Sequence, residues 1–261
     1  MPAYPWTSVL VTGASSGLGR ALAEGCAAPG VVLHLAGRDA GRLAAAAEAC
    51  RARGATVRDA VLDVTDAAAT AAWVRGAGRL DLVIANAGIS GGTGTATEPA
   101  EQAARIFATN VTGVLNTALP AIEAMAAQAP GAGGLRGRVA VIASLAAFVA
   151  APGAPAYCAS KAAVQRWAEA LDASERARGI RLHAVCPGYV RTPMTARNPF
   201  PMPFLMEPAE AARRTLDGIA RGRLRVAYPL PLYLAARLAG GLPPGWRNRL
   251  MRVLPAKQQE G

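Results

Sequence analysis

Short apolar runs alternate with longer, alanine-rich stretches along most of the chain. Six runs are typical of buried β-strands, at residues 8–11, 31–35, 57–62, 82–85, 139–143 and 182–185. Segments of helical length separate these runs, and this alternation predicts repeated βα units whose strands form a parallel sheet. We therefore expect an α/β fold, with a Rossmann-like, doubly wound parallel sheet between two layers of helices.

A glycine-rich turn follows the first predicted strand and leads into a helical segment, residues 20–27. Glycines let a backbone turn tightly and approach a pyrophosphate, whose charge is attracted by the free amides and dipole of the following helix. A plain βα turn is the alternative. The candidate dinucleotide contacts in this turn are Gly13, Ser15, Ser16, Gly17, Leu18 and Gly19.

Tyr157 and Lys161 are four residues apart in the helical segment 156–173, so their side chains share one face. A nearby ammonium is expected to lower the pKa of a phenol, which would then exchange protons with a substrate oxygen. Ser144 ends the preceding strand, thirteen residues before the tyrosine, and its hydroxyl can hold the same oxygen. A Tyr-x-x-x-Lys pair alone also arises by chance.

The glycine spacing, G-x-x-x-G-x-G, resembles that of the short-chain dehydrogenase/reductase family, and further motifs follow in the family's order. By this resemblance, Asp63 and Val64 contact the adenine ring, and Asn86, Ala87 and Gly88 form the family's N-A-G turn. The resemblance also assigns a nicotinamide loop to Pro187, Gly188, Val190 and Thr192.

The same resemblance implies a mechanism. Ser144 would orient the substrate oxygen, Tyr157 would transfer the proton, and Lys161 would hold the nicotinamide ribose. Asn110 resembles the fourth member of the family's catalytic set, which anchors a water and extends the proton path to Lys161. A buried asparagine at a helix kink is the alternative. No metal is required.

The end of the second strand bears on the choice between NADP(H) and NAD(H). An acidic side chain there accepts hydrogen bonds from the ribose of NAD, whereas an arginine pairs with the 2′-phosphate of NADP. Gly37 stands where NAD-preferring relatives carry the acid, and Arg38 follows it. We therefore expect NADP(H), with NAD(H) as the alternative because Asp39 is adjacent and Ser16 stands where a second basic residue is frequent.

With 261 residues, of which 52% are hydrophobic, the chain can bury one large core. We expect a single NAD(P)-binding domain over residues 1–261, with the Gly/Pro-rich segment 130–137 as a loop inside it. Residues 193–261 are expected to supply a substrate flap and a basic C-terminal extension. The apolar flap, residues 194–206, favours a hydrophobic substrate, although its side chains could equally pack on the body of the enzyme.

The net charge of +11 is concentrated near the C-terminus: residues 207–261 carry ten basic and four acidic side chains. Apolar and aromatic residues interleave with arginine there, so peripheral contact with a membrane is an alternative to packing on the body or on a second subunit, which we favour. Aromatic residues make up only 5% of the chain and no nucleic-acid-binding motif is found, which argues against nucleic acid as a partner.

The four cysteines are scattered, which predicts reduced thiols rather than a zinc site or disulfides. Residues 1–11 lack a secretory signal, so we expect a cytoplasmic protein. His34 and His183 fall in predicted strands and are expected to be buried and inactive.

Together these features predict an enzyme that interconverts a carbonyl compound and an alcohol. A dinucleotide-binding scaffold or sensor without turnover is the alternative, but such a protein could dispense with Tyr157 and Lys161. A homodimer or homotetramer is implied by the family resemblance alone.

Overall fold

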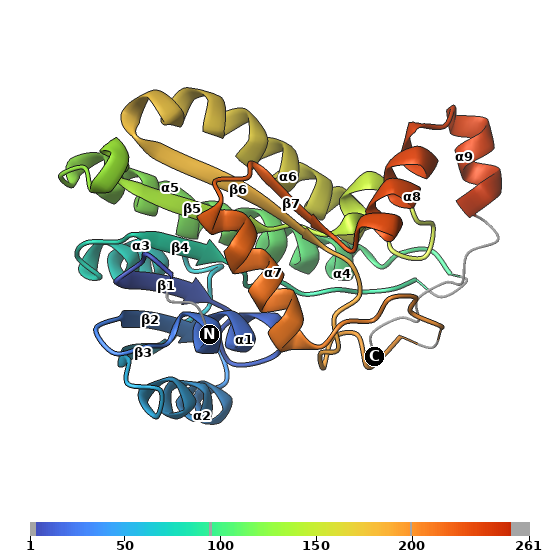
Figure 1. Ribbon diagram of the computed structural model, residues 1–261. Helices are drawn as coiled ribbons and strands as arrows, with labels where there is room; N and C mark the ends of the chain where they lie inside the picture. The colour runs from blue at the N-terminus through green and yellow to red at the C-terminus, as the bar shows by residue number, and fades with distance from the viewer. Residues whose placement is uncertain (1–3, 94–95, 199, 252–261) are drawn as a thin grey trace.

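The computed structural model describes residues 4–93, 96–198 and 200–251. Within them, seven parallel strands form one sheet in the order β3-β2-β1-β4-β5-β6-β7 (Figure 1). The strands are β1 (Ser8–Thr12), β2 (Val32–Gly37), β3 (Thr56–Val61), β4 (Leu82–Ala85), β5 (Gly137–Ile142), β6 (Ile180–Pro187) and β7 (Arg225–Tyr228). The expected doubly wound sheet is confirmed, and its strand order reverses between β1 and β4.

Helices cover both faces of the sheet (Figure 1). One face packs against α1 (Gly17–Cys26), α2 (Ala40–Arg51) and α7 (Pro208–Ala220). The other packs against α3 (Ala67–Gly76), α5 (Gly113–Ala127) and α6 (Pro155–Glu175), which α4 (Ala100–Phe107) contacts. Because side chains alternate along a strand, Val9 and Val11 of β1 join the first core and Leu10 joins the second.

One strand prediction needs correction, and one strand was not predicted. The segment 57–62 was expected to be a buried strand, but β3 is an edge strand whose side chains are mostly exposed, including Val61 at 64%. No apolar run predicted β7, which begins with Arg225 and has only four residues. It is a strand because it pairs with β6, a tertiary contact that no local pattern encodes.

Within the described residues, β7 is followed by α8 (Leu230–Gly241) and α9 (Pro244–Met251). Pro199 of the predicted flap and residues 252–261 of the predicted extension lie outside the described residues. Among the described residues, no helix is both long and apolar enough to cross a bilayer.

Several minor expectations are confirmed. The segment 130–137 connects α5 to β5 and contains a short 3-10 turn, Ala132–Gly134. Both histidines are buried within strands, and the ring of His183 hydrogen-bonds the carbonyl of Arg223. All four cysteines are buried and free.

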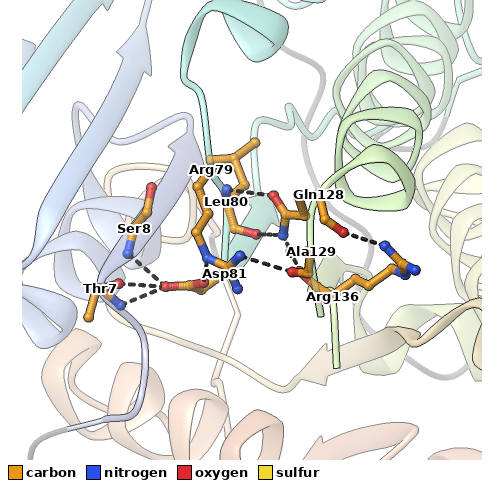
Figure 2. Close-up of polar contacts among 8 residues, drawn as sticks. All are labelled: Thr7, Ser8, Arg79, Leu80, Asp81, Gln128, Ala129 and Arg136. Carbon is orange, nitrogen blue, oxygen red and sulfur yellow. Dashed lines mark hydrogen bonds and ion pairs between the residues drawn. The ribbon is translucent and has the colours of Figure 1, made fainter. Parts of the chain in front are cut away.

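A polar network joins the segments just before β1 and β4 to the end of α5 (Figure 2). The Asp81 carboxylate accepts hydrogen bonds from the backbone amides of Thr7 and Ser8 at 2.9 and 3.1 Å, and pairs with Arg79. Gln128 exchanges two hydrogen bonds with the backbone of Leu80. The network therefore ties the start of β1 to the start of β4 and the end of α5.

Replacing Asp81 with alanine is expected to lower the free energy of unfolding by about 2 kcal/mol, because two backbone amides lose their acceptor. Burial raises the pKa of Asp81, but hydrogen bonds from Thr7 and Ser8 and the charge of Arg79 outweigh it and leave the pKa below its ordinary value. This contribution is therefore present above the unfolded-state pKa and is lost as pH falls through the folded-state pKa. Urea denaturation at neutral and acidic pH measures it.

The matched control for this prediction is Glu123→Ala, which removes an exposed carboxylate that pairs with Arg75. Its stability should stay within about 0.5 kcal/mol of the wild type. An Asp81→Ala loss that persists unchanged at acidic pH would contradict the electrostatic explanation.

Candidate active site

The glycine-rich turn is fixed to the end of β4 by two side chains. Asn86 donates from Nδ2 to the carbonyls of Thr12 and Gly13, at 3.0 and 3.2 Å. In return, the Thr12 hydroxyl accepts from the backbone amides of Asn86 and Ala87. The N-A-G segment thus supports the turn across the point where the strand order reverses, which is where open α/β sheets form their binding crevice.

Two glycines of this turn leave no room for a side chain. A Cβ at Gly19 would lie 2.1 Å from the carbonyl oxygen of Gly13, and Gly13 itself has a φ of +66°. Ser16, the residue before α1, makes no side-chain cap, and the first turn of α1 has no acidic residue. The backbone amides at the start of α1 are therefore not covered by a capping or acidic side chain. Together with the positive end of the helix dipole, they suit a negatively charged group.

At the end of β2, two arginines line the same cleft as the turn. Arg38 forms an exposed ion pair with Asp63, at 3.5 Å, and Arg42 lies one helical turn further on. The Asp39 carboxylate caps α2 by accepting from the Arg42 amide at 2.9 Å and also binds the Arg42 guanidinium. Asp39, the acidic residue whose position favoured NAD(H), therefore already binds the start of α2 and the Arg42 side chain.

The side chains of Ser144, Tyr157 and Lys161 meet at the opposite end of the cleft. Ser144 lies close enough to Tyr157 to lower the pKa of its phenol, and its hydroxyl also accepts from the backbone amide of Ala146 at 3.1 Å. Tyr157 lies in the first turn of α6, and the Lys161 ammonium is 5.9 Å from the centre of its ring. Lys161 is only 4% exposed and donates to the carbonyl of Ile142 at 2.8 Å, so its ammonium has a fixed position.

The structure reverses the expected direction of the tyrosine shift. Burial raises the pKa of Tyr157 to about 12, and the hydrogen bond with Ser144 offsets only part of this effect. Burial also lowers the pKa of Lys161 to about 8. The expected net lowering of the Tyr157 pKa is therefore not found in the protein without ligands, because desolvation of the phenol dominates.

Asn110 does not line the cleft, but its hydrogen bonds support residues next to the cleft. It is fully buried in a π-helical turn, Ala108–Thr112, a feature that is frequent at functional sites. Its side-chain amide accepts from the backbone amide of Ile89 and donates to the carbonyl of Ile89 and to the Ser160 hydroxyl. Ser160 in turn donates to the Tyr157 carbonyl, so Asn110 connects the N-A-G segment to the helix of the tyrosine.

The glycine-rich turn, the two arginines and the side chains of Ser144, Tyr157 and Lys161 surround one cleft of about 640 Å³ at the carboxyl ends of the strands. Except for Asn110, every residue that the sequence suggested for cofactor or catalysis lines it: Gly13, Ser15, Ser16, Gly17, Leu18, Gly19, Arg38, Asp63, Val64, Asn86, Ala87, Gly88, Ser144, Tyr157, Lys161, Pro187, Gly188, Val190 and Thr192. Two residues were not identified from the sequence. Arg42 was marked only by its position four residues after Arg38, and no feature of the sequence marked Ser160.

The predicted flap contributes little to this cleft. Pro193, Met194 and Thr195 line it, whereas Met206 is buried against the body and forms a bridge with Val190. Phe204 is 57% exposed. The flap thus divides into a part that borders the cleft and a part that packs on the protein, which are the two alternatives left open by its apolar composition.

Comparison with known proteins agrees with this geometry. Residues 7–200 match the family model described as short chain dehydrogenase. The chain is 40% identical to an oxidoreductase of Myxococcus xanthus (strain DK1622) named as uncharacterized, over 93% of this chain and 95% of that protein.

Two solved structures share the fold. A short-chain dehydrogenase from Sphingobium yanoikuyae in complex with NADPH is 31% identical, with a TM-score of 0.78 over 97% of this chain and 98% of that one. A short chain dehydrogenase/reductase from Burkholderia phymatum in complex with NAD is 24% identical, and its TM-score of 0.81 over all of both chains shows the shared fold alone.

Proposed function

The chain belongs to the short-chain dehydrogenase/reductase family, and we propose that it interconverts a ketone or aldehyde and an alcohol, with NADP(H) as cofactor and Tyr157 as proton donor or acceptor. The observation that carries the proposal is the meeting of Ser144, Tyr157 and Lys161 in the cleft that also holds the glycine-rich turn. One cleft then offers a proton-transfer group beside a cradle for an anionic cofactor.

The residues of the cleft fit a nicotinamide dinucleotide. The bare backbone at Gly13 and Gly19 and the uncapped start of α1 suit its pyrophosphate. Asp63 and Val64 would receive the adenine, and Gly188 and Thr192 would border the nicotinamide. When bound, the cofactor supplies or accepts the hydride, and the protein supplies position and electrostatics.

The proton side of the reaction follows from the positions of three side chains. Ser144 and Tyr157 both line the cleft, and Ser144 is close enough to the phenol to lower its pKa, so both hydroxyls can reach a single substrate oxygen. Ser144 would hold that oxygen while Tyr157 donates its proton. The ammonium of Lys161 stabilises the phenolate that results. Asn110 would act as a positioning residue, because it holds the loop at Ile89 and the start of α6 together.

The pKa of Tyr157, raised to about 12, keeps the phenol protonated at neutral pH. A protonated phenol is the form that reduction of a carbonyl requires, whereas oxidation of an alcohol requires the phenolate. At neutral pH the ligand-free enzyme is therefore in the form that donates a proton to a carbonyl oxygen. The substrate we propose is hydrophobic, because the apolar side chain of Met194 lines the cleft.

The test of the function is fluorescence titration with NADPH and NADH, followed by a panel of aliphatic ketones, steroids, acyl thioesters and sugars. We expect binding of NADPH and its oxidation with apolar carbonyl compounds. Absence of binding for both dinucleotides would overturn the proposal and favour a scaffold role.

The preference for NADP(H) is supported by two arginines near the end of β2. Arg38 and Arg42 line the cleft, and the acid between them, Asp39, is already neutralised by Arg42 and by the start of α2. The Arg38–Asp63 pair is exposed and therefore weak, so Arg38 can turn to a 2′-phosphate at small cost.

Arg38→Ala is expected to weaken NADPH binding by roughly 10- to 100-fold, the equivalent of one charge-assisted hydrogen-bonding group. NADH affinity should change little, because NADH has no 2′-phosphate. Arg75→Ala, which removes an exposed arginine of α3 outside the cleft, is the matched control. Equal losses for the two cofactors would contradict the assignment of Arg38 to the 2′-phosphate.

A further inference from the structure

The outer side of α8 presents an apolar stripe to solvent. Leu230, Leu234 and Leu238 are 61%, 55% and 76% exposed, and their four-residue spacing places them on one side of the helix. Trp246 of α9, the helix that contacts α8, is 74% exposed. Large apolar groups gathered in this way commonly mark an interaction surface. We call the side chains of Leu230, Leu234, Leu238 and Trp246 the α8–α9 surface.

The opposite side of α8 is firmly attached to the protein. The Tyr233 ring packs edge-to-face on Phe148, with ring centres 5.2 Å apart, and its hydroxyl accepts from Arg225. A Cβ at Gly240 would lie 1.8 Å from the carbonyl oxygen of Phe148, so the helix is in direct backbone contact there. Because these contacts set the rotation of α8, the helix cannot turn its leucines inward. In Figure 1, α8 and α9 stand apart from the helices that cover the sheet.

The charged residues of α8 and α9 are all basic. Residues 230–251 contain Arg237, Arg247 and Arg249 and no aspartate or glutamate. Arg237 and Arg249 are exposed; Arg237 directly precedes Leu238 in the chain, and its guanidinium lies over the Tyr233 ring. Apolar side chains flanked by arginines are typical of helices that lie in the interface of an anionic membrane, where the long basic side chains reach the headgroups.

Charge also decides between the two occupants that such a surface could have. In a symmetric dimer through α8 and α9 these arginines would face residues 230–251 of the second copy, which contain no acidic residue. Lipid phosphates provide the missing negative charge. We propose that the α8–α9 surface binds an anionic membrane, with Leu230, Leu234 and Leu238 among the upper acyl chains and the arginines at the phosphates. The proposal is independent of the reaction proposed above.

The experiment is sedimentation of the full-length protein with two kinds of vesicle, phosphatidylcholine alone and phosphatidylcholine mixed with phosphatidylglycerol. We expect binding to the mixed vesicles at low salt, at least about tenfold weaker binding to the neutral vesicles, and a clear loss at high salt. The double substitution Leu234→Gln and Leu238→Gln should lower the affinity for the mixed vesicles at least about tenfold, since the inserted groups become polar.

The matched control is Val61→Gln, an equally exposed apolar position on β3 at the far edge of the sheet, which should bind vesicles like the wild type. Circular dichroism melts establish that the variants are folded. Failure of the wild type to bind mixed vesicles, or binding that the double substitution leaves intact, would overturn the proposal. Light scattering tests the other occupant: a dimer that dissociates on the double substitution, without lipid binding, would assign the surface to a second copy.

Discussion

Replacing Tyr157 with phenylalanine is expected to lower kcat for carbonyl reduction by roughly 10²- to 10⁴-fold, the usual contribution of a positioned acid or base. Only the hydroxyl is lost. The ring, which borders the cleft beside Lys161, keeps its place at the start of α6. The measurement is steady-state reduction of a carbonyl substrate, together with fluorescence titration of the dinucleotide, whose affinity should stay within a few-fold of the wild type.

Tyr233→Phe is the matched control, because it removes a tyrosine hydroxyl that binds Arg225 outside the cleft. Its kcat should remain close to that of the wild type. The wild-type rate of alcohol oxidation should rise with pH above neutrality, since the pKa of Tyr157 lies at about 12 in the ligand-free protein and oxidation needs the phenolate. A Tyr157→Phe enzyme with wild-type kcat would remove the tyrosine from the mechanism.

Replacing Lys161 with methionine is expected to abolish most of the activity and to change how stability depends on pH. Burial lowers the pKa of Lys161 to about 8, below the value of about 10.4 for a lysine in an unfolded chain. Between these two values the unfolded chain binds more protons than the native protein, so the native protein gains stability as pH rises. The wild type should therefore gain about 2 kcal/mol relative to Lys161→Met between about pH 7 and about pH 9.5.

Urea denaturation of both proteins at the two pH values measures this difference. Arg166→Gln changes an exposed cation on the same helix, and its stability relative to the wild type should not vary with pH in this range. A wild-type and Lys161→Met difference that is the same at both pH values would show that the lysine is not desolvated. That result would contradict the lowered pKa of Lys161.

Much of the candidate site could be predicted because its parts are encoded locally. A glycine-rich turn between a strand and a helix depends on a few neighbouring φ angles, and Tyr157 and Lys161 share a face because they are four residues apart in one helix. Apolar runs likewise determine which segments become strands, and parallel strands bring their carboxyl ends to one edge. The fold, the turn and the position of Tyr157 beside Lys161 are therefore properties of the sequence itself.

Tertiary structure decided what depends on contacts between distant segments. Only the strand order makes β3 an edge strand and gives β7 a partner in β6. Only the meeting of three segments gives the Asn110 amide its bonds to Ile89 and Ser160. Desolvation depends on everything packed around a group, so the raised pKa of Tyr157 had no counterpart in the Tyr-x-x-x-Lys spacing. The same holds for α8, because its contacts with Phe148, and not its composition, leave its leucines exposed to solvent.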